Sequence, residues 1–252
     1  MQHYRCYENK LNIVCFKWGT KYSARHVNNL YKQVKRYLNY KFNFYCITDD
    51  SNDLDSNIQT YPFWGELDRI KNTSHAKKPL NNFKRLKLYD RKILSYFNYN
   101  VLMLDLDVVV CGNIDFLAEL QKNSMWLSAS VGRNKETLNT SVTRVINDEF
   151  CLIYDKFIQN PLKIIDETRR AGWKGTDQAI ITHLYKENIV HLTKRHGIIS
   201  FKEFEAKHKN HKELPEWVKI LAFYGADEDP GNVKIWKQYP FIEHLWRNTI
   251  KE

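Results

Sequence analysis

Two aspartates interrupt an apolar stretch of the chain. Asp105 and Asp107 lie in VLMLDLDVVV, residues 101–110, which is otherwise hydrophobic. A β-strand alternates its faces every two residues, so the spacing predicts that both carboxylates point to the same side. Like charges beside a buried sheet repel and lose hydration, and a shared proton, a basic partner or a divalent cation would relieve this. Oxygen ligands favour Mg²⁺ or Mn²⁺, although turn residues at a strand end give the same short pattern.

The elements that must position these aspartates indicate an α/β fold. An apolar run at 12–16 predicts a strand, and residues 42–48 predict another. Between them, apolar residues recur at helical spacing after Ser23, which is a suitable helix N-cap. Strand, helix and strand with short connections predict a parallel sheet with a right-handed crossover. Ligands bind beyond the carboxyl ends of such strands, where the aspartates are expected.

The remaining chain predicts further alternation of strands and helices. Residues 64–80 are expected to form a long loop, and the charged residues 201–213 a solvated loop or helix. Because we find no repeat and no linker, one compact domain over residues 1–252 is the simplest interpretation. Strands are expected near 58–63, 101–110, 125–130, 140–146 and 218–223, and helices near 82–97, 114–121, 148–158, 161–170, 176–186 and 240–250.

Composition limits the class of protein. Hydrophobic residues make up 43% and aromatic residues 14% of the 252 residues, which is typical of a folded globular chain. The 39 Lys and Arg outnumber the 29 Asp and Glu, and the net charge of +10 favours anionic partners. The five cysteines are widely spaced without a C-x-x-C pair, which predicts no zinc site or disulfide framework and favours a reducing, cytoplasmic setting.

Several enzyme classes lack their motifs in this sequence. It contains no H-E-x-x-H, no G-x-S-x-G and no G-x-x-x-x-G-K-[ST], which argues against a zinc hydrolase, an α/β-hydrolase and a P-loop ATPase. The basic segment 207–212 is typical of a solvated face, so we expect no nucleic-acid partner. A metal-dependent nucleic-acid-binding protein stays the weaker alternative. Peripheral contact of the basic chain with an anionic membrane is compatible with its charge.

Several short segments together resemble a known family. Arg85-Leu86-Lys87-Leu88, followed after about fifteen residues by VLMLDLDVVVCGNIDFL, resembles the nucleotide-sugar-dependent glycosyltransferases of the GT-A fold, with retaining glycosyltransferase family 8 and its bacterial relatives closest. Their order over residues 12–235 makes the set specific, although each is weak alone. The other matching segments are FKWGTKY at 16–22, NTSV at 139–142, GTDQ at 175–178, and AFYG at 222–225 with Pro230.

The resemblance implies a fold and an activity. It implies a single GT-A, Rossmann-like domain with a mostly parallel central sheet flanked by helices. The nucleotide-binding half would span about residues 1–110 and the acceptor half about residues 111–252. The implied reaction moves a hexose from a nucleotide sugar, with a UDP-sugar expected, to a glycan or other hydroxyl acceptor with retention. The implied cofactor is Mn²⁺ or Mg²⁺.

The resemblance also implies roles for matching residues. Asp105 and Asp107 would hold the metal on the donor diphosphate. The other matching residues would bind the nucleotide or the sugar of the donor. Lys17, Gly19 and Tyr22 would line the nucleotide pocket, Arg85 with Lys84 would reach the donor sugar or phosphate, and Asp177 and Gln178 would face the sugar ring near the anomeric carbon.

The last segment departs from the family pattern. Where the family has a histidine ligand before glycine, this chain has Tyr224 before Gly225, and Glu228-Asp229 precede Pro230 where the family has lysine. A neutral phenol is a poor ligand for a hard cation, and acidic residues cannot replace a lysine at a phosphate. This difference leaves a nucleotide- or glycan-binding protein without efficient turnover as an alternative function. Three explanations are open: a third metal ligand from Asp227 or Glu228, a contact of Lys234 with the diphosphate, or a weakened site.

Overall fold

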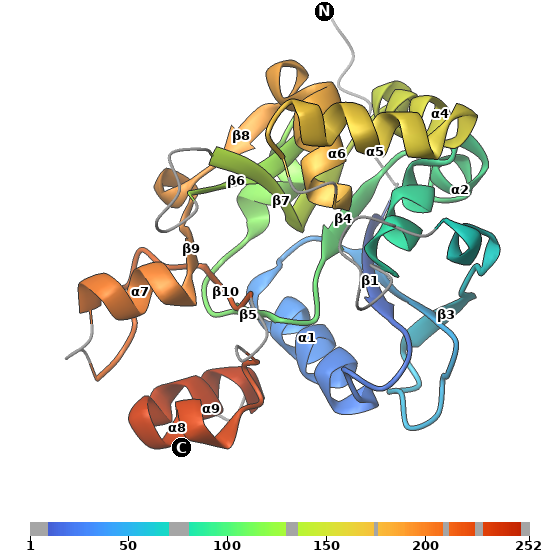
Figure 1. The fold of residues 1–252 in the computed structure, drawn as a ribbon. Helices are drawn as coiled ribbons and strands as arrows, with labels where there is room; N and C mark the ends of the chain where they lie inside the picture. The colour runs from blue at the N-terminus through green and yellow to red at the C-terminus, as the bar shows by residue number, and fades with distance from the viewer. Residues whose placement is uncertain are drawn as a thin grey trace, which may run out of the picture.

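The computed structural model describes residues 10–70, 81–129, 136–173, 176–208, 212–224 and 229–247. Within these ranges the chain forms a seven-stranded sheet in the order β3-β2-β1-β4-β7-β6-β8 and a smaller sheet in the order β5-β10-β9 (Figure 1). The strands are β1 (Leu11–Lys17), β2 (Phe42–Thr48), β3 (Ile58–Pro62), β4 (Val101–Leu104), β5 (Val108–Val110), β6 (Ser124–Ala129), β7 (Glu136–Val145), β8 (Val190–Leu192), β9 (Ile198–Ser200) and β10 (Ile220–Ala222).

The helices fall between these strands along most of the chain. The α-helices are α1 (Ala24–Tyr37), α2 (Arg91–Tyr96), α3 (Asp115–Glu119), α4 (Cys151–Gln159), α5 (Pro161–Arg170), α6 (Asp177–Tyr185), α7 (Phe201–His208), α8 (Val233–Gln238) and α9 (Pro240–Arg247). Short 3₁₀ segments are η1 (Glu66–Arg69), η2 (Asn81–Tyr89), η3 (Asp148–Phe150), η4 (Lys186–Asn188) and η5 (Lys194–His196). No described helix is long and apolar enough to cross a membrane.

The βαβ opening is confirmed. β1 pairs with β2 in parallel along its whole length, and α1 connects them. On its other side β1 pairs in parallel with β4, while β7 runs antiparallel to β4 and to β6. The predicted mostly parallel sheet flanked by helices is therefore the observed α/β architecture.

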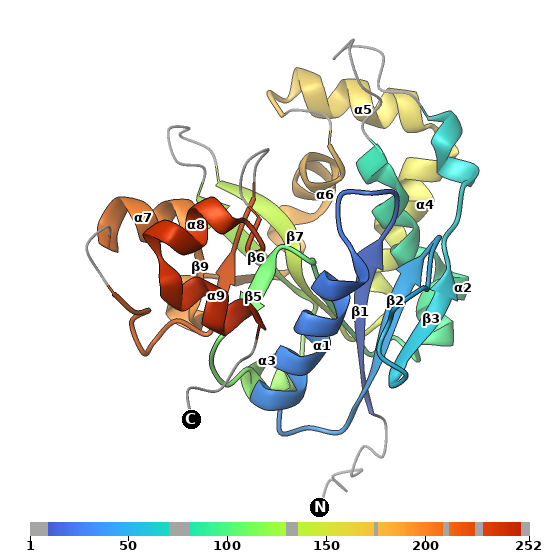
Figure 2. The same cartoon turned by 90° about the horizontal axis from the view of Figure 1, so that it is seen from below.

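Helices cover both faces of the large sheet, as a mostly parallel sheet requires. Alternate residues of β1 enter opposite cores: Val14 packs on the side of α2, α4 and α6, and Ile13 packs on the side of α1 and α3. Figure 2 shows α1 and α3 away from α4, α5 and α6. A third apolar core joins the small sheet to α7, α8 and α9. The two faces explain why β1 is buried along its whole length.

The prediction of one strand over residues 101–110 was wrong. β4 ends at Leu104 and joins the large sheet, whereas β5 begins at Val108 and pairs with β10 in the small sheet. Asp105 and Asp107 therefore lie on the connection between two sheets rather than on alternate positions of one strand. A run of apolar residues does not reveal this break, because both strands are fully buried.

Other boundaries also differ from the prediction. The expected helix over 82–97 is divided into η2 and α2 by Asp90, whose side chain accepts a hydrogen bond from the Lys92 N–H and caps the second helix. The strands β8 and β9 and the helix α8 were not predicted, because each has only three to six residues. Segments this short carry little periodicity.

Candidate functional site

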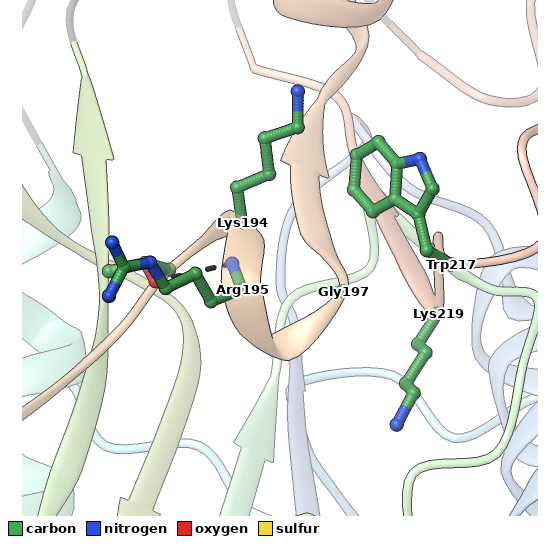
Figure 3. A pocket seen from close by; sticks show the side chains of 6 residues that line it. Lys194, Arg195, Gly197, Trp217 and Lys219 are labelled. Carbon is green, nitrogen blue, oxygen red and sulfur yellow. Dashed lines mark hydrogen bonds between the residues drawn. The ribbon is translucent and has the colours of Figure 1, made fainter.

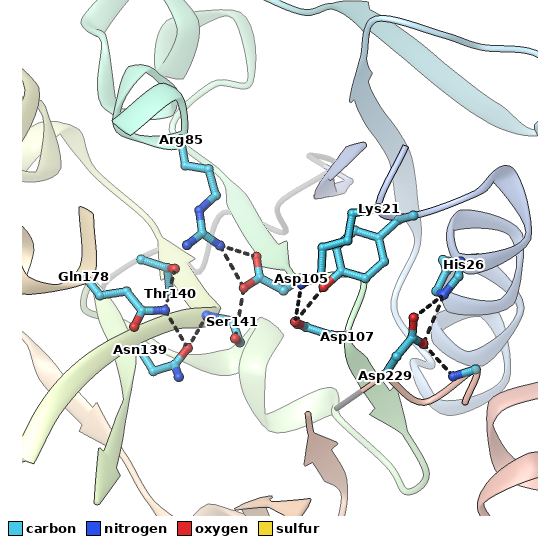
Figure 4. A network of polar contacts seen from close by, with 12 residues as sticks. Lys21, His26, Arg85, Asp105, Asp107, Asn139, Thr140, Ser141, Gln178 and Asp229 are labelled. Carbon is cyan, nitrogen blue, oxygen red and sulfur yellow. Dashed lines mark hydrogen bonds and ion pairs between the residues drawn. The ribbon is translucent and has the colours of Figure 1, made fainter. Parts of the chain in front are cut away.

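Asp105 is the centre of a polar cluster at the carboxyl end of β4. Its two carboxylate oxygens each accept a hydrogen bond of 2.8 Å from Nη1 of Arg85, which lies on η2. Ser141 of β7 donates its hydroxyl to Oδ2 at 2.9 Å, and the Asp105 N–H bonds to the Ser141 carbonyl at 3.1 Å. Figure 4 shows these contacts converging on Asp105. Two separate elements, η2 and β7, therefore fix this carboxylate.

Asp107 is held from the opposite direction by the loop after β1. The Tyr22 hydroxyl donates to its Oδ2 at 2.8 Å, and Nζ of Lys21 lies 4.0 Å from the same oxygen. Its other oxygen, Oδ1, is buried and has no hydrogen-bond partner among the described residues. Burial, followed by the charge of Asp105, raises the pKa of Asp107 to about 7, while Tyr22 and Lys21 act in the opposite direction. This side chain is a desolvated carboxylate with a free oxygen.

Arg85 bridges the pair to a third acid, Asp177. Its Nε and Nη2 lie 2.9 and 2.7 Å from Oδ2 of Asp177. Asp177 is 1% exposed and begins α6, whose N-cap is the Thr176 side chain. Burial raises the pKa of Asp177, and the Arg85 charge opposes that shift. Burial lowers the pKa of Arg85, but Asp105 and then Asp177 outweigh it, so the guanidinium stays charged.

Gln178 contacts the same segment of β7 that supports Asp105. Its amide nitrogen lies 3.3 Å from Oδ1 of Asn139 and 3.4 Å from Oγ1 of Thr140. Oδ1 of Asn139 also accepts the Ser141 N–H at 2.9 Å. Figure 4 shows this chain of contacts reaching Asp105. The segments around residues 85, 105, 140 and 177, far apart in sequence, thus meet around Asp105.

The three residues expected in the nucleotide pocket have different surroundings. Lys17 is buried, and its ammonium binds the Asp50 carbonyl at 2.8 Å and the Asp50 carboxylate at 3.0 Å. Gly19 is exposed with φ of +60°, a conformation that favours glycine, and its N–H bonds to Asp49. Tyr22 is the member of this set whose side chain bonds to the acidic pair.

The remaining expected ligands are less closely joined to the pair. Lys84 is buried with its ammonium 4.9 Å from the centre of the Phe63 ring. The Tyr224 hydroxyl is buried and has no hydrogen-bond partner among the described residues. Lys234 is exposed on α8, and no contact between described residues links it to Asp105 or Asp107. Gly225, together with Asp227 and Glu228, lies outside the described residues.

Three contacts were not predicted from the sequence. Ser141 and Lys21 lie within segments that carried the resemblance, but nothing in their spacing identifies the oxygen that each approaches. The third contact joins Nε2 of His26 on α1 to Oδ1 of Asp229, 3.2 Å away. Burial raises the pKa of Asp229, but the His26 hydrogen bond and the Gly231 N–H outweigh it, so its pKa is lowered. Asp229, which precedes Pro230 where the family has lysine, is therefore already bound to His26.

The acidic pair offers oxygens that suit a hard cation. No residue in the described ranges bonds to Oδ1 of Asp107, and Asp105 lies close enough to raise the pKa of Asp107. Mg²⁺ and Mn²⁺ favour carboxylate oxygens, so these two residues fit a divalent cation, with Arg85 competing for Asp105. Among the described residues no third histidine, cysteine or acid completes a metal-binding group. A complete ligand set would need donors from elsewhere, such as a ligand phosphate.

Comparison with known proteins places this geometry in a known fold. A crystal structure of an active-site mutant of LgtC matches with a TM-score of 0.63 at 15% identity, over 96% of this chain and 98% of that chain. The glycosyltransferase GlyE of Streptococcus pneumoniae TIGR4 matches with a TM-score of 0.58 at 16% identity, over 95% of this chain. The chain has a GT-A glycosyltransferase fold.

These matches establish the GT-A fold alone, because the sequence identities are low. The chain spans 63% of the length of GlyE. LgtC is also described as a galactosyltransferase in complex with donor and acceptor sugar analogs, at a TM-score of 0.57 and 15% identity. No protein-family model and no curated protein matches the sequence.

Proposed function

We propose that this protein is a metal-dependent glycosyltransferase that moves a hexose from a UDP-sugar to a hydroxyl group of a glycan or similar acceptor, with retention. The observation that carries the proposal is the meeting of Asp105 and Asp107 at the carboxyl end of β4, where Oδ1 of Asp107 is buried and has no hydrogen-bond partner within the described part of the chain. The GT-A fold supports it, since LgtC was crystallised with donor and acceptor sugar analogs.

The acidic pair would hold the cation through Asp107 and Asp105. When bound, a divalent cation supplies positive charge against the diphosphate as it leaves. Tyr22 keeps the Asp107 carboxylate in place at 2.8 Å, and Ser141 does the same for Asp105 at 2.9 Å. Lys21 lies on the loop after β1, with its side chain 60% exposed near Asp107, and can reach a phosphate from there. Preorganised charge of this kind stabilises the departing group more than the bound donor.

Arg85 and a bound cation would compete for the carboxylate of Asp105. Its guanidinium occupies Asp105 and Asp177 at distances of 2.7 to 2.9 Å. In the proposed reaction Arg85 turns part of its five donors from Asp105 toward the donor sugar or phosphate, while Asp177 keeps it charged and oriented. The carboxylate of Asp177 then lies near the sugar and stabilises positive charge at the anomeric carbon.

Retention agrees with the engagement of the buried acids. An inverting enzyme needs a carboxylate that accepts the proton of the acceptor hydroxyl. Asp177 is the first residue to consider for that role, but one of its oxygens receives two contacts from Arg85. Because Arg85 holds that oxygen in an ion pair, we assign Asp177 to charge stabilisation together with Gln178.

A protein that binds nucleotide or glycan with little turnover is the second candidate. It is favoured by the occupation of both Asp105 oxygens by Arg85 and by the presence of Tyr224. An arginine that never leaves Asp105 would prevent the cation from using both carboxylates. Tyr224 would then fill the space of a ligand without supplying one.

Thermal unfolding with UDP, with GDP or with a short oligonucleotide tests the proposal, each with and without Mn²⁺. A ligand at 100 times its dissociation constant should add about 2.7 kcal/mol of stability. Stabilisation by UDP that requires Mn²⁺ is expected. Release of UDP from a panel of UDP-sugars then separates an enzyme from a binding protein.

The matched variants are Asp105→Asn with Asp107→Asn, and Asp166→Asn as a control on the exposed face of α5. The double variant should lose UDP release while retaining its circular dichroism spectrum, and the control should keep its activity. Unchanged release in the double variant would remove the metal assignment. Binding of UDP and Mn²⁺ without release in the native protein would favour the second candidate.

A further inference from the structure

A hollow lies on the surface formed by the later part of the chain. Its volume is about 830 Å³, and it lies where η5 faces the segment that leads into β10 (Figure 3). It is wide and open to solvent, with the Trp217 side chain on one wall. The lining residues are Thr193, Lys194, Arg195, Gly197, Trp217 and Lys219.

The hollow is separate from the acidic pair. In the small sheet, Ala222 pairs with Val108 beside the acidic pair, whereas Ile220 pairs with Val110 at the far end. Lys219 precedes that far end, and Tyr224 follows the near end. The five steps between Lys219 and Tyr224 correspond to roughly 16 Å of extended chain. The two sites therefore lie toward opposite ends of β10, and the residues that line the hollow have no role in the proposed chemistry.

The shape of the hollow depends on close backbone packing at Gly197. This residue has φ of +81°, and a Cβ atom there would lie 2.7 Å from both the Trp217 carbonyl and Cγ of Lys219. Its carbonyl accepts the N–H groups of Lys219 and Ile220 at 2.8 and 3.0 Å. The two walls are thus fixed to each other by main-chain bonds. A rigid wall keeps the indole of Trp217, which is 37% exposed, at the surface.

The rim of the hollow carries unbalanced positive charge. Nζ of Lys194 lies 4.8 Å from the centre of the Trp217 ring and 3.9 Å from Glu203. Glu203 also binds Lys207 at 2.7 Å, so one carboxylate serves two ammonium groups.

Two more cationic side chains stand at the same rim. Among the described residues, neither Arg195 nor Lys219 forms an ion pair within 4.0 Å. The Lys219 ammonium lies 4.8 Å from the centre of the Phe116 ring, and its charge contributes to the lowered pKa of Asp115. Figure 3 shows the side chains of Lys194, Arg195 and Lys219 pointing in different directions around the hollow. Diverging cations do not converge on one small anion. They match a ligand whose negative charges are spaced along a chain.

We propose that this hollow binds an acidic glycan, with a sugar ring against Trp217 and its carboxylate or phosphate groups on Lys194, Arg195 and Lys219. The identification of the ligand as the acceptor rests on the proposed function, whereas its binding does not. A single exposed indole favours a glycan over single-stranded nucleic acid, because proteins that bind single strands use successive aromatic platforms. Contacts far from the reacting atoms hold a substrate in place and lower its KM.

The test uses tetragalacturonic acid, its neutral methyl ester and a tetranucleotide as probes in isothermal titration calorimetry. The titrations contain EDTA and no nucleotide, so binding is measured independently of donor and metal. We expect the acid to bind at least about tenfold more tightly than its ester, with affinity that falls as salt is added. Trp217→Ala and the double variant Lys194→Gln with Lys219→Gln should each weaken binding of the acid about tenfold or more.

The control variant is Lys163→Gln, which removes an exposed lysine from α5 and should leave binding unchanged. Equal binding of acid and ester, or an equal loss in the control, would overturn the inference. Tighter binding of the tetranucleotide than of the acid would overturn it as well. If the acid binds as expected but no UDP-sugar is turned over, the glycan site stands and the proposed transferase function fails.

Discussion

Replacing Asp107 with asparagine should change stability in a manner that depends on pH. The folded protein holds the Asp107 proton up to pH about 7, whereas an unfolded aspartate releases it near pH 3.9. Because the pKa of Asp107 is higher in the folded than in the unfolded protein, its protonated carboxyl contributes its full stabilisation only at a pH below the pKa of the unfolded aspartate. This stabilisation is lost progressively as pH rises to about 7, where the charge becomes buried in the folded state.

The size of this effect follows from the shift. About three pKa units at 1.36 kcal/mol each give a loss of up to about 4 kcal/mol in the native protein between pH 4 and pH 8. The asparagine variant lacks this loss. Its amide group places either a donor or an acceptor at the buried position of Oδ1, at a cost of about 1–3 kcal/mol that does not vary with pH. The variant should therefore gain stability relative to the native protein as pH rises.

The measurement is urea unfolding of both proteins at pH 5, 6, 7 and 8 in EDTA, with Asp166→Asn as a control. The difference between the native protein and the Asp107 variant should change by about 2.7 kcal/mol across this series, because two pH units lie between pH 5 and the folded pKa of about 7. The control should differ from the native protein by less than about 0.5 kcal/mol throughout. Adding Mn²⁺ should stabilise the native protein at pH 8 and have little effect at pH 5, since a proton and a cation compete for the same oxygen. A difference that stays constant from pH 5 to pH 8 would refute the burial of a charged Asp107.

Three other substitutions test the contacts around the pair. Arg85→Ala should destabilise the protein by about 3–5 kcal/mol in urea unfolding, because it leaves two buried carboxylates without their partner; a loss below about 1 kcal/mol would contradict the bridge. Tyr22→Phe should cost about 1 kcal/mol and move the pH midpoint of Mn²⁺ binding upward, because its hydroxyl favours the charged form of Asp107. Lys21→Gln should leave stability within about 0.5 kcal/mol yet weaken UDP binding in calorimetry, whereas Lys163→Gln should change neither.

Local periodicity was sufficient to predict much of the nucleotide-binding side of the fold. The apolar strands at residues 11–17 and 42–48 and the amphipathic helix between them are encoded by contiguous residues, so β1 and β2 match their predicted ranges within about one residue. Ser23 was predicted as the N-cap of α1, because a cap depends on the residues that follow it within one turn. The strands β8 and β9 and the helix α8 contain too few residues to display a period.

The site was predicted as a set of residues rather than as a geometry. Asp105 and Asp107 were identified because two charges in an apolar run are costly wherever the chain places them. Their expected alternation on one strand was wrong, since the chain leaves the large sheet at Leu104 and enters the small sheet at Val108. The strand is interrupted because its first half, β4, pairs with β7 and its second half, β5, pairs with β10. Both partner strands lie far along the chain, so the local sequence does not reveal the interruption.

The sequence by itself determined which side chains are ionisable and which segments must be buried, because both depend on residue type and on neighbours along the chain. The tertiary structure alone decided that Arg85 faces Asp105 and Asp177, that Tyr22 bonds to Asp107, and that His26 engages Asp229. These contacts join residues 20 to 203 positions apart. Their distances follow from the packing of helices on the sheet, and packing is a property of the whole fold that no local pattern contains.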